Sequence, residues 1–302
     1  MITLEDIEKR QIIDFGHKCK VWLVSVHGTC YALKEVPKTD LNDMEVKHLF
    51  DEKQALQTLS HPNIIKLITT FKDDANLYFL LELARGAPLS YLIKQQRKFP
   101  LENVQSIVYQ LAETLGYIHS QGFVYRDLKL SNVLLDTNGK ITLVDLGLCT
   151  KIDQRREFVV AGTTHSMAPE MILHMVSGGM ALGYSYQIDW WALGILTYEL
   201  LIGTPPFGLF GEDIIQNIVA GIQNVDMKDL TGTARNLIIR LLCPDPNSRL
   251  GCSGPSEILE HPFMEIRSPI KPSLSLMNGI NSWSEFTEDT EEISGPDPFK
   301  DF

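Results

Sequence analysis

The chain has 302 residues, of which 44% are hydrophobic and 22% are charged, a composition that suits a globular protein with one large core or two modest lobes. Its formal net charge of -11 argues against a nucleic-acid-binding protein and suits basic protein partners. No apolar run approaches the length of a membrane span, so we expect no membrane-spanning segment.

The first third of the chain predicts a small lobe rich in strands. Short apolar runs bounded by turn residues predict strands at 11–15, 21–26, 29–36, 65–70 and 77–83. Between the third and fourth strands, residues 44–59 repeat their apolar side chains at helical spacing, which predicts one helix.

After Gly86 the pattern becomes helical. Residues 101–120 carry apolar side chains at helical spacing, and residues 186–201 are nearly continuously apolar, as in a helix buried on most sides. The glycine-rich stretch 176–183 predicts a flexible loop. We therefore expect an α+β fold with a β-rich N-lobe, a larger helical C-lobe, a cleft near residues 81–90 and a polar C-terminal tail.

The strand at 29–36 contains the first candidate for chemistry. Alternation places Ala32 and Lys34 on one face, which suits a strand that covers a flat base while the ammonium reaches toward phosphates. A surface lysine on an amphipathic strand is the alternative. The next helix favours the first interpretation, because Glu52 lies on the same stripe as Leu49 and Leu56. A buried carboxylate is costly unless it is paired, so we expect a Lys34–Glu52 ion pair.

Two short segments carry the densest set of polar residues. The first reads Tyr125-Arg-Asp-Leu-Lys-Leu-Ser-Asn132, and the second reads Val144-Asp-Leu-Gly147. Phosphoryl transfer requires a group that orients the incoming hydroxyl, a cation near the developing charge and oxygen ligands for magnesium.

Four residues of these segments could supply those functions. Asp127 would orient the hydroxyl, Lys129 would neutralise the transferring phosphoryl group, and Asn132 and Asp145 would bind Mg²⁺. Taken singly, Asp127 or Asn132 could be a turn residue that caps a loop. The order and spacing of the whole set favour one catalytic cleft.

The same residues resemble the signature set of eukaryotic protein kinases. The matching motifs are Tyr31-Ala-Leu-Lys34, Glu52, Tyr125-Arg-Asp127, Asn132, Asp145-Leu-Gly147 and Ala168-Pro-Glu170. The resemblance implies the bilobal protein-kinase fold, with a kinase domain at 4–264, an N-lobe at about 4–84 and a C-lobe at about 85–264, followed by a tail at 265–302. Lys129, close after Asp127, resembles the serine/threonine branch.

Other motifs resemble the AGC group, which contains the cyclic-AMP- and cyclic-GMP-dependent protein kinases. These are Tyr125 in place of the usual His, Asn247-Ser-Arg-Leu-Gly251, His261-Pro-Phe263 and the terminal Phe299-x-x-Phe302. The resemblance implies that the two terminal aromatic residues dock on the small lobe and steady the helix of Glu52. A disordered tail with an apolar tip is the alternative.

The resemblance also implies ATP and Mg²⁺ as cofactors and assigns further residues. Thr163 would contact Asp127 and Lys129, and Glu170 would pair with Arg249. The implied nucleotide contacts are Ile13, Gly16, Val21, Ala32, Lys34, Glu52, Glu82, Ala84 and Leu135.

Two regulatory features depart from the family pattern. The segment Asp14-Phe-Gly16-His-Lys-Cys19 stands where the family has Gly-x-Gly-x-x-Gly, so we expect weaker nucleotide binding than is usual for the family. Val159 stands where related kinases carry a phosphothreonine. We therefore expect a loop that is not switched by phosphorylation there, with Glu157 as an acidic partner for the cations that remain, Arg126 and His48.

Substrate selection also departs from the pattern. Pro88, Ser131 and His165 replace acidic residues that bind basic substrates in related kinases, and Glu199 remains. A peptide with a basic consensus should therefore be a poor substrate.

The leading hypothesis is an ATP-dependent serine/threonine kinase that acts on protein substrates. One alternative is a kinase-fold scaffold with weak or no phosphotransfer, which the eroded glycine loop favours. A second alternative is a small-molecule kinase of the same fold. Ala168-Pro-Glu170 and Asp189 argue against this alternative.

The sequence also carries expectations about context. We expect a monomeric catalytic subunit with a regulatory protein acting in trans, since no cyclic-nucleotide-binding domain fits before Leu4. The five cysteines form no CxxC pair and the N-terminus has no apolar signal core, so we expect a cytoplasmic protein that could also enter the nucleus.

Overall fold

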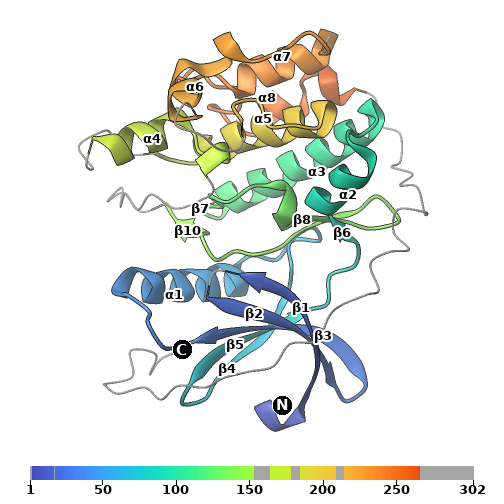
Figure 1. The fold of residues 1–302 in the computed structure, drawn as a ribbon, viewed down its shortest axis with the longest axis vertical. Helices are drawn as coiled ribbons and strands as arrows, with labels where there is room; N and C mark the ends of the chain where they lie inside the picture. Colours follow the sequence, from blue (N-terminus) through green and yellow to red (C-terminus); the bar gives the residue numbers. More distant parts are fainter. Residues whose placement is uncertain are drawn as a thin grey trace.

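The computed structural model describes residues 2–16, 18–152, 164–177, 184–208, 214–230 and 232–265. Figure 1 shows these residues as two lobes, one built mainly of strands and the other mainly of helices. Within these ranges, no helix combines the length and the apolar composition that crossing a bilayer requires.

The N-lobe contains an antiparallel five-stranded sheet with the order β1-β2-β3-β5-β4. The strands are β1 (Ile7–Gly16), β2 (Cys19–Val26), β3 (Thr29–Pro37), β4 (Leu67–Lys72) and β5 (Asn76–Glu82), after a short 3-10 helix at Leu4–Asp6. All five predicted strands are present. β4 begins later than predicted because Ile64 and Ile65 leave the sheet: Ile64 bridges to Leu143, and the Ile65 N–H donates to the Leu143 carbonyl of the other lobe (3.0 Å).

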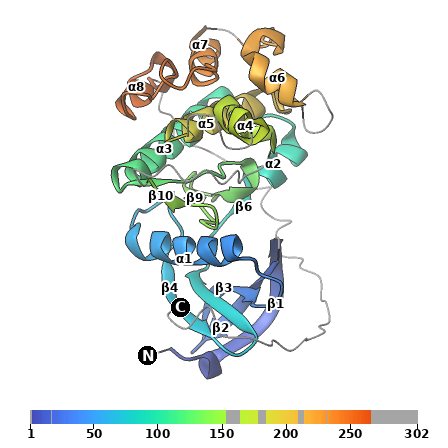
Figure 2. The ribbon, with the colours of Figure 1, turned by 90° about the vertical axis from the view of Figure 1, so that its left-hand side faces the viewer.

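The N-lobe helix α1 (Asp43–Thr58) begins one residue before the predicted start at 44. A capping box sets this start: Asn42 Oδ1 accepts from the Glu45 N–H, and Glu45 Oε2 accepts from the Asn42 N–H (both 2.9 Å). The predicted inner stripe is buried, including Glu52. Both views place α1 between the N-lobe sheet and the strand β10 (Thr150–Lys151) of the C-lobe (Figures 1 and 2).

The C-lobe is built around two long helices. Its helices are α2 (Leu89–Gln96), α3 (Leu101–Ser120), α4 (Pro169–Val176), α5 (Gln187–Ile202), α6 (Ile214–Ala220), α7 (Gly232–Leu241) and α8 (Ser256–Leu259). α3 has the predicted bounds, and α5 is buried along most of its length, as its continuous apolar sequence predicts. α5 ends at Gly203, whose φ of +98° is the left-handed conformation that favours glycine at a helix end.

Two small sheets line the junction of the lobes. One has the order β6-β8-β9 and the other pairs β10 with β7. Their remaining strands are β6 (Ala87–Pro88), β7 (Phe123–Val124), β8 (Val133–Leu135) and β9 (Ile141–Leu143), and 3-10 helices lie at Leu130–Asn132, Thr164–Ser166, Gly221–Asn224 and Pro262–Met264. One apolar cluster joins Leu49 and Leu56 of α1 to Leu111 of α3, so the two lobes share a core.

Several predicted features lie outside the described residues. These are the loop residues 178–183, the tail with Phe299 and Phe302, and Val159, Glu157 and Thr163.

Candidate active site

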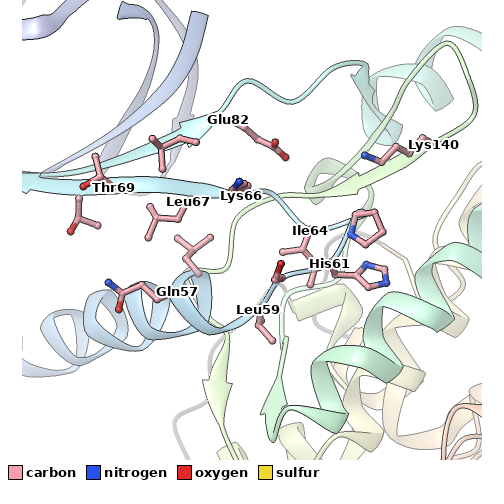
Figure 3. Close-up of a pocket in the computed structure, with 14 residues that line it drawn as sticks. Gln57, Leu59, His61, Ile64, Lys66, Leu67, Thr69, Glu82 and Lys140 are labelled. Atoms are coloured by element: carbon pink, nitrogen blue, oxygen red, sulfur yellow. The ribbon is translucent and has the colours of Figure 1, made fainter. Parts of the chain in front are cut away.

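A pocket of about 690 Å³ opens beside the junction of the lobes. It lies between the end of α1, the segment leading into β4, and the turn that carries Lys140 (Figure 3). Of the predicted site residues that the structure describes, Glu82 alone lines it. The candidate catalytic residues are therefore located by their own contacts rather than by this pocket.

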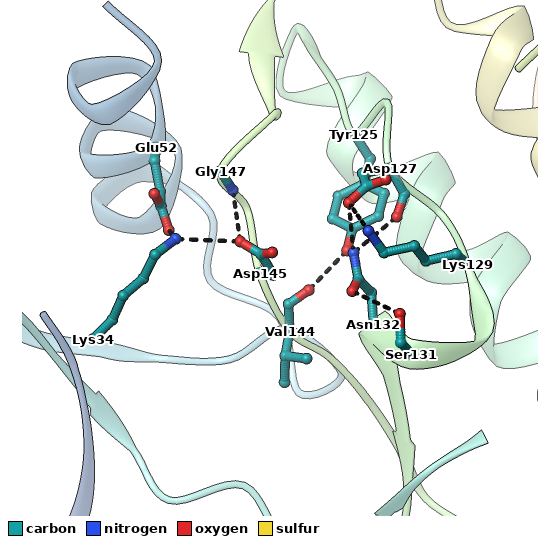
Figure 4. Close-up of polar contacts among 10 residues, drawn as sticks. All are labelled: Lys34, Glu52, Tyr125, Asp127, Lys129, Ser131, Asn132, Val144, Asp145 and Gly147. Carbon is teal, nitrogen blue, oxygen red and sulfur yellow. Dashed lines mark hydrogen bonds and ion pairs between the residues drawn. The ribbon is translucent and has the colours of Figure 1, made fainter. Parts of the chain in front are cut away.

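Lys34 on β3 lies between two carboxylates. Its Nζ donates to Glu52 Oε1 (2.6 Å) and to Asp145 Oδ1 (3.3 Å), so the predicted Lys34–Glu52 pair is present (Figure 4). Burial alone would lower the pKa of Lys34, but the Asp145 and Glu52 carboxylates outweigh burial and raise that pKa. Lys34 lowers the pKa of Asp145, while burial raises the pKa of Glu52 against the effect of Lys34.

The backbone around Asp145 is shaped for this contact. Asp145 has a φ of +57°, a left-handed conformation that costs free energy in a residue other than glycine and often marks functional sites. The Gly147 N–H donates to Asp145 Oδ1 (3.2 Å). A Cβ on Gly147 would lie 3.1 Å from that oxygen and 3.5 Å from both Glu52 Oε2 and Lys34 Nζ. Glycine thus lets the chain pass close to the ion cluster.

Asp127 lies in the loop between β7 and β8 and is 5% exposed. Its Oδ2 accepts from Lys129 Nζ (2.7 Å) and from Asn132 Nδ2 (2.9 Å), and the same Asn132 amide donates to the Asp127 carbonyl (3.0 Å). Burial raises the pKa of Asp127, and the hydrogen bonds from Lys129 and Asn132 oppose that rise. The three side chains thus form one preorganised polar group.

Asp189, at the start of α5, fixes the backbone of the loop that carries Asp127. Its carboxylate is fully buried and accepts the backbone N–H groups of Tyr125 (2.9 Å) and Arg126 (2.8 Å). His119 Nε2 completes the group at 2.8 Å from Asp189 Oδ2. The sequence showed no signal for His119, because one histidine at the end of an amphipathic helix resembles a surface residue.

The two polar segments are joined to each other. The Tyr125 hydroxyl donates to the Val144 carbonyl (2.7 Å), and the Val144 N–H donates to the Asn132 carbonyl (2.9 Å). Figure 4 shows Asp145 between Lys34 on one side and the group around Asp127 on the other. These contacts bring the six predicted polar residues into one cluster at the junction of the lobes.

The predicted magnesium ligands have suitable oxygen atoms. Asn132 uses its amide nitrogen on Asp127, so its Oδ1 remains for a cation beside the weakly bonded Ser131 hydroxyl (3.4 Å). Asp145 uses Oδ1 for Lys34 and Gly147, and among the described residues Oδ2 receives no hydrogen bond. An amide oxygen and a carboxylate oxygen suit a hard cation such as Mg²⁺.

Four of the predicted nucleotide contacts lie on strands of the two lobes. Ala32 and Leu135 are buried, whereas Ile13 and Val21 are half-buried. Ala32 lies on β3 opposite Leu81 of β5, and Leu135 lies on β8 in the C-lobe. The four residues thus belong to both lobes, as a base held between lobes requires.

The connection between the lobes offers backbone groups. The Glu82 N–H donates to the Lys66 carbonyl (2.9 Å), which fixes the backbone where the connection between the lobes begins. Ala84 is half-buried against the core. Gly86 has a φ of +106°, and a Cβ there would lie 2.3 Å from the Leu135 carbonyl oxygen. Glycine at this position lets the connection pack directly on the floor of the cleft.

The hairpin between β1 and β2 holds the residues that depart from the glycine-rich pattern. Gly16 pairs with Cys19, whose sulfur lies over Gly16: a Cβ on Gly16 would be 2.3 Å from Cys19 Sγ. Asp14 accepts the Phe15 N–H (2.8 Å). Burial raises the pKa of Asp14, Asp145 raises it further and Lys129 lowers it, so the Asp14 charge lies within the field of the cleft.

The Glu170–Arg249 pair that the resemblance implies is present in the C-lobe. Arg249 makes a two-pronged ion pair with Glu170 of α4, through Nη1 to Oε1 (2.7 Å) and Nη2 to Oε2 (2.9 Å). The Arg249 side chain is fully buried, so this pair is part of the C-lobe interior.

Two lobes joined beside a cleft that holds a Lys–Glu pair and an Asp–Lys–Asn group define a protein kinase. The family profile of the protein kinase domain matches residues 7–264, and the chain belongs to this family.

Its relatives are AGC-type serine/threonine kinases. It is 32% identical to an atypical protein kinase C of Drosophila melanogaster over 98% of this chain and 52% of that protein. It is also 32% identical to a cAMP-dependent protein kinase catalytic subunit of Arthrobotrys oligospora, over 99% of this chain and 60% of the relative. A RAC serine/threonine-protein kinase of Drosophila melanogaster is 30% identical over 98% of this chain and 51% of its own length. The chain thus spans about half the length of the relatives that it matches.

Proposed function

We propose that this chain transfers the γ-phosphoryl group of ATP to serine or threonine residues of protein substrates. The observation that carries this proposal is the Asp127 carboxylate, held by Lys129 and Asn132 in the same cleft as the Lys34–Glu52 pair and Asp145. Family membership supports it, because AGC relatives are serine/threonine kinases.

Each residue has a task that its contacts support. Asp127 accepts a hydrogen bond from the substrate hydroxyl and orients it, and Lys129 places its positive charge beside the transferring group. Glu52 would hold the Lys34 ammonium toward the nucleotide phosphates, and Asn132 and Asp145 would hold the metal. Bound magnesium–ATP supplies the phosphoryl group and neutralises charge on the phosphates.

The alternatives are less well supported. A scaffold has no use for the hydrogen-bonded set Lys34, Glu52, Asp127 and Asn132, which is intact. A small-molecule kinase is disfavoured because Ala168-Pro-Glu170, whose Glu170 is held by Arg249, resembles the segment next to which peptide substrates bind in protein kinases.

The direct test is transfer of radiolabelled phosphate from ATP to a mixed peptide library, with Asp127→Asn as the control. Incorporation that disappears in the control supports the proposal, and the labelled peptides reveal the specificity. We expect few basic consensus peptides among them, because Pro88, Ser131 and His165 carry no negative charge. Equal incorporation by both proteins would contradict the proposal.

Asp14→Gly should strengthen ATP binding. Removing one negative charge near the phosphates relieves a repulsion of about 1 kcal/mol, which corresponds to roughly fivefold in the dissociation constant of magnesium–ATP. Calorimetric titration measures it. Asp14→Asn separates the charge from the added flexibility of glycine, and Glu8→Gln, on an exposed part of the same strand, controls for net charge. An unchanged dissociation constant in Asp14→Gly and Asp14→Asn would show that the charge of Asp14 does not affect the binding of magnesium–ATP.

Glu199, on α5, should make the stability of the protein depend on pH. Burial raises the pKa of Glu199 to about 7, well above the ordinary value of a glutamate. The folded state therefore binds this proton more tightly than the unfolded state, and the Glu199 contribution to stability decreases as pH rises from about 4.5 to 7. Raising the pH from 5 to 8 should lower the urea midpoint of the unmodified protein relative to that of Glu199→Gln, because only the unmodified protein loses this contribution. An identical change in both would contradict the raised pKa.

The raised pKa of Glu199 also supports the expectation that basic peptides are poor substrates. A glutamate that is partly protonated near neutral pH attracts a basic substrate residue less strongly than an ordinary carboxylate.

The regulatory protein in trans, the monomeric state and the cytoplasmic location stay predictions from the sequence.

A further inference from the structure

A hydrogen bond between described residues ties α1 to the C-lobe. Thr150 Oγ1, on β10, donates to Asp51 Oδ2 on α1 (2.9 Å). Asp51 directly precedes Glu52, and successive residues of a helix point about 100° apart. Glu52 therefore reaches Lys34 of the N-lobe, while its neighbour Asp51 reaches the segment that follows Asp145 in the C-lobe.

The C-lobe end of this contact is firmly held. Thr150 pairs with Val124 directly before the loop of Asp127. Arg126 Nε, from that loop, donates to the Leu148 carbonyl (2.6 Å), and the Cys149 side chain between Leu148 and Thr150 is fully buried. Thr150 is thus a fixed point relative to the catalytic loop.

On the N-lobe side, the Asp51–Thr150 hydrogen bond involves α1. The position of α1 determines whether Glu52 can reach Lys34. α1 is anchored at its start by the Asn42–Glu45 capping box and by the ion pair of Glu45 with Lys18 in the turn between β1 and β2 (2.8 Å), both within the N-lobe. Both views place α1 directly against β10 (Figures 1 and 2). A contact at Asp51, one residue from Glu52, therefore limits rotation and outward displacement of the helix at the place where the ion pair forms.

Basic side chains lie near this contact. They include His48 of α1 itself and Arg126 of the C-lobe loop. Burial lowers the pKa of His48, Arg126 lowers it further, and the Asp51 carboxylate raises it. The Asp51 carboxylate of α1 is thus already present beside His48 and Arg126, the two residues that the sequence associated with an absent phosphothreonine at Val159. Because its pKa is lowered, His48 is mostly neutral near pH 7, so Arg126 is the cation of the two.

We propose that Asp51 and Thr150 are positioning residues that hold α1, and through it the Lys34–Glu52 pair, in the arrangement needed for phosphotransfer. The inference rests on the proposed kinase function. It makes the position of α1 a property of the folded chain that requires no phosphate at position 159.

The test compares Thr150→Val, which removes the hydroxyl at nearly constant volume, with Thr150→Ser, which keeps it. In nucleotide-free protein, amide hydrogen exchange across residues 43–58 should become roughly tenfold faster in Thr150→Val, as loss of a hydrogen bond to a charged group implies. Thr150→Ser should exchange like the unmodified protein. Thr137→Val, in an exposed turn, is the matched control and should leave exchange in α1 unchanged.

Kinetics separate positioning from general stability. In Thr150→Val, kcat should fall roughly tenfold while the KM for peptide stays constant, because the peptide platform lies in the C-lobe. Asp51→Ala should have the same effect, and the double variant Thr150→Val/Asp51→Ala should be no worse than either single variant.

The outcomes are distinguishable. Unchanged exchange and unchanged kcat in Thr150→Val would overturn the inference, as would additive losses in the double variant. If the unmodified protein transfers no phosphate while Thr150→Val still accelerates exchange in α1, the contact between α1 and β10 is supported and the proposed function fails instead.

Discussion

Asp127→Asn should lower kcat by about 10²–10⁴-fold, the usual contribution of a positioned acid–base group. The amide is nearly isosteric with the carboxylate, but it carries no negative charge and cannot accept a proton from the substrate hydroxyl. Asp127 accepts hydrogen bonds from both Lys129 and Asn132, so the loss should fall on the reacting geometry. Initial rates with a peptide identified in the library measure it.

The controls for this prediction separate chemistry from folding. Magnesium–ATP should bind with an unchanged dissociation constant, because Asp127 is assigned to the hydroxyl rather than to the nucleotide. Asp74→Asn makes the same chemical change at an exposed position in the N-lobe and should leave kcat unchanged. A kcat within twofold of the unmodified value in Asp127→Asn would show that Asp127 does not orient the hydroxyl.

Arg249→Met should lower the free energy of unfolding by about 3–5 kcal/mol, because it leaves a buried carboxylate without its partner. The Glu170 side chain is 12% exposed, so water cannot replace the guanidinium. Arg249 also donates to the carbonyls of Gln187 (2.9 Å) and Cys243 (3.0 Å), which would lose their partners. Urea denaturation measures this loss.

Two further variants test the cause of the effect. Combining Arg249→Met with Glu170→Gln removes both charges, and it should recover part of the stability, because an unpaired charge costs more than a neutral amide. Arg10→Met removes an arginine whose side chain is 48% exposed and should change stability by less than about 0.5 kcal/mol. Equal losses in Arg249→Met and Arg10→Met would contradict the role of the buried pair.

Elements with strong local patterns were predictable. α3 has the predicted bounds because its apolar spacing persists over the whole segment 101–120. The start of β4 was not predictable, since Ile64 and Ile65 are apolar enough for a strand but bond to Leu143 of the other lobe instead. Such a partner is distant in the chain, so a local pattern contains no information about it.

The candidate site also contains residues that the sequence predicted and one that it missed. The motif order predicted that Lys34, Glu52, Asp127 and Asp145 would share a cleft, and the observed Lys34–Glu52 distance of 2.6 Å agrees with it. Their roles in phosphotransfer stay predictions. The supporting contact of His119 was missed, because its meaning depends on Asp189, which comes from another helix.

The sequence by itself determined the α+β pattern, the family and the identity of the polar residues, because these depend on local periodicity and on motifs a few residues long. Only the tertiary structure decided how α1 is held. Asp51 and Thr150 are far apart in sequence and ordinary in type, and they form a hydrogen bond because the fold packs α1 against β10. The candidate catalytic residues are thus specified by short motifs, whereas the contact that we propose to position α1 forms only when long-range packing brings Asp51 and Thr150 together.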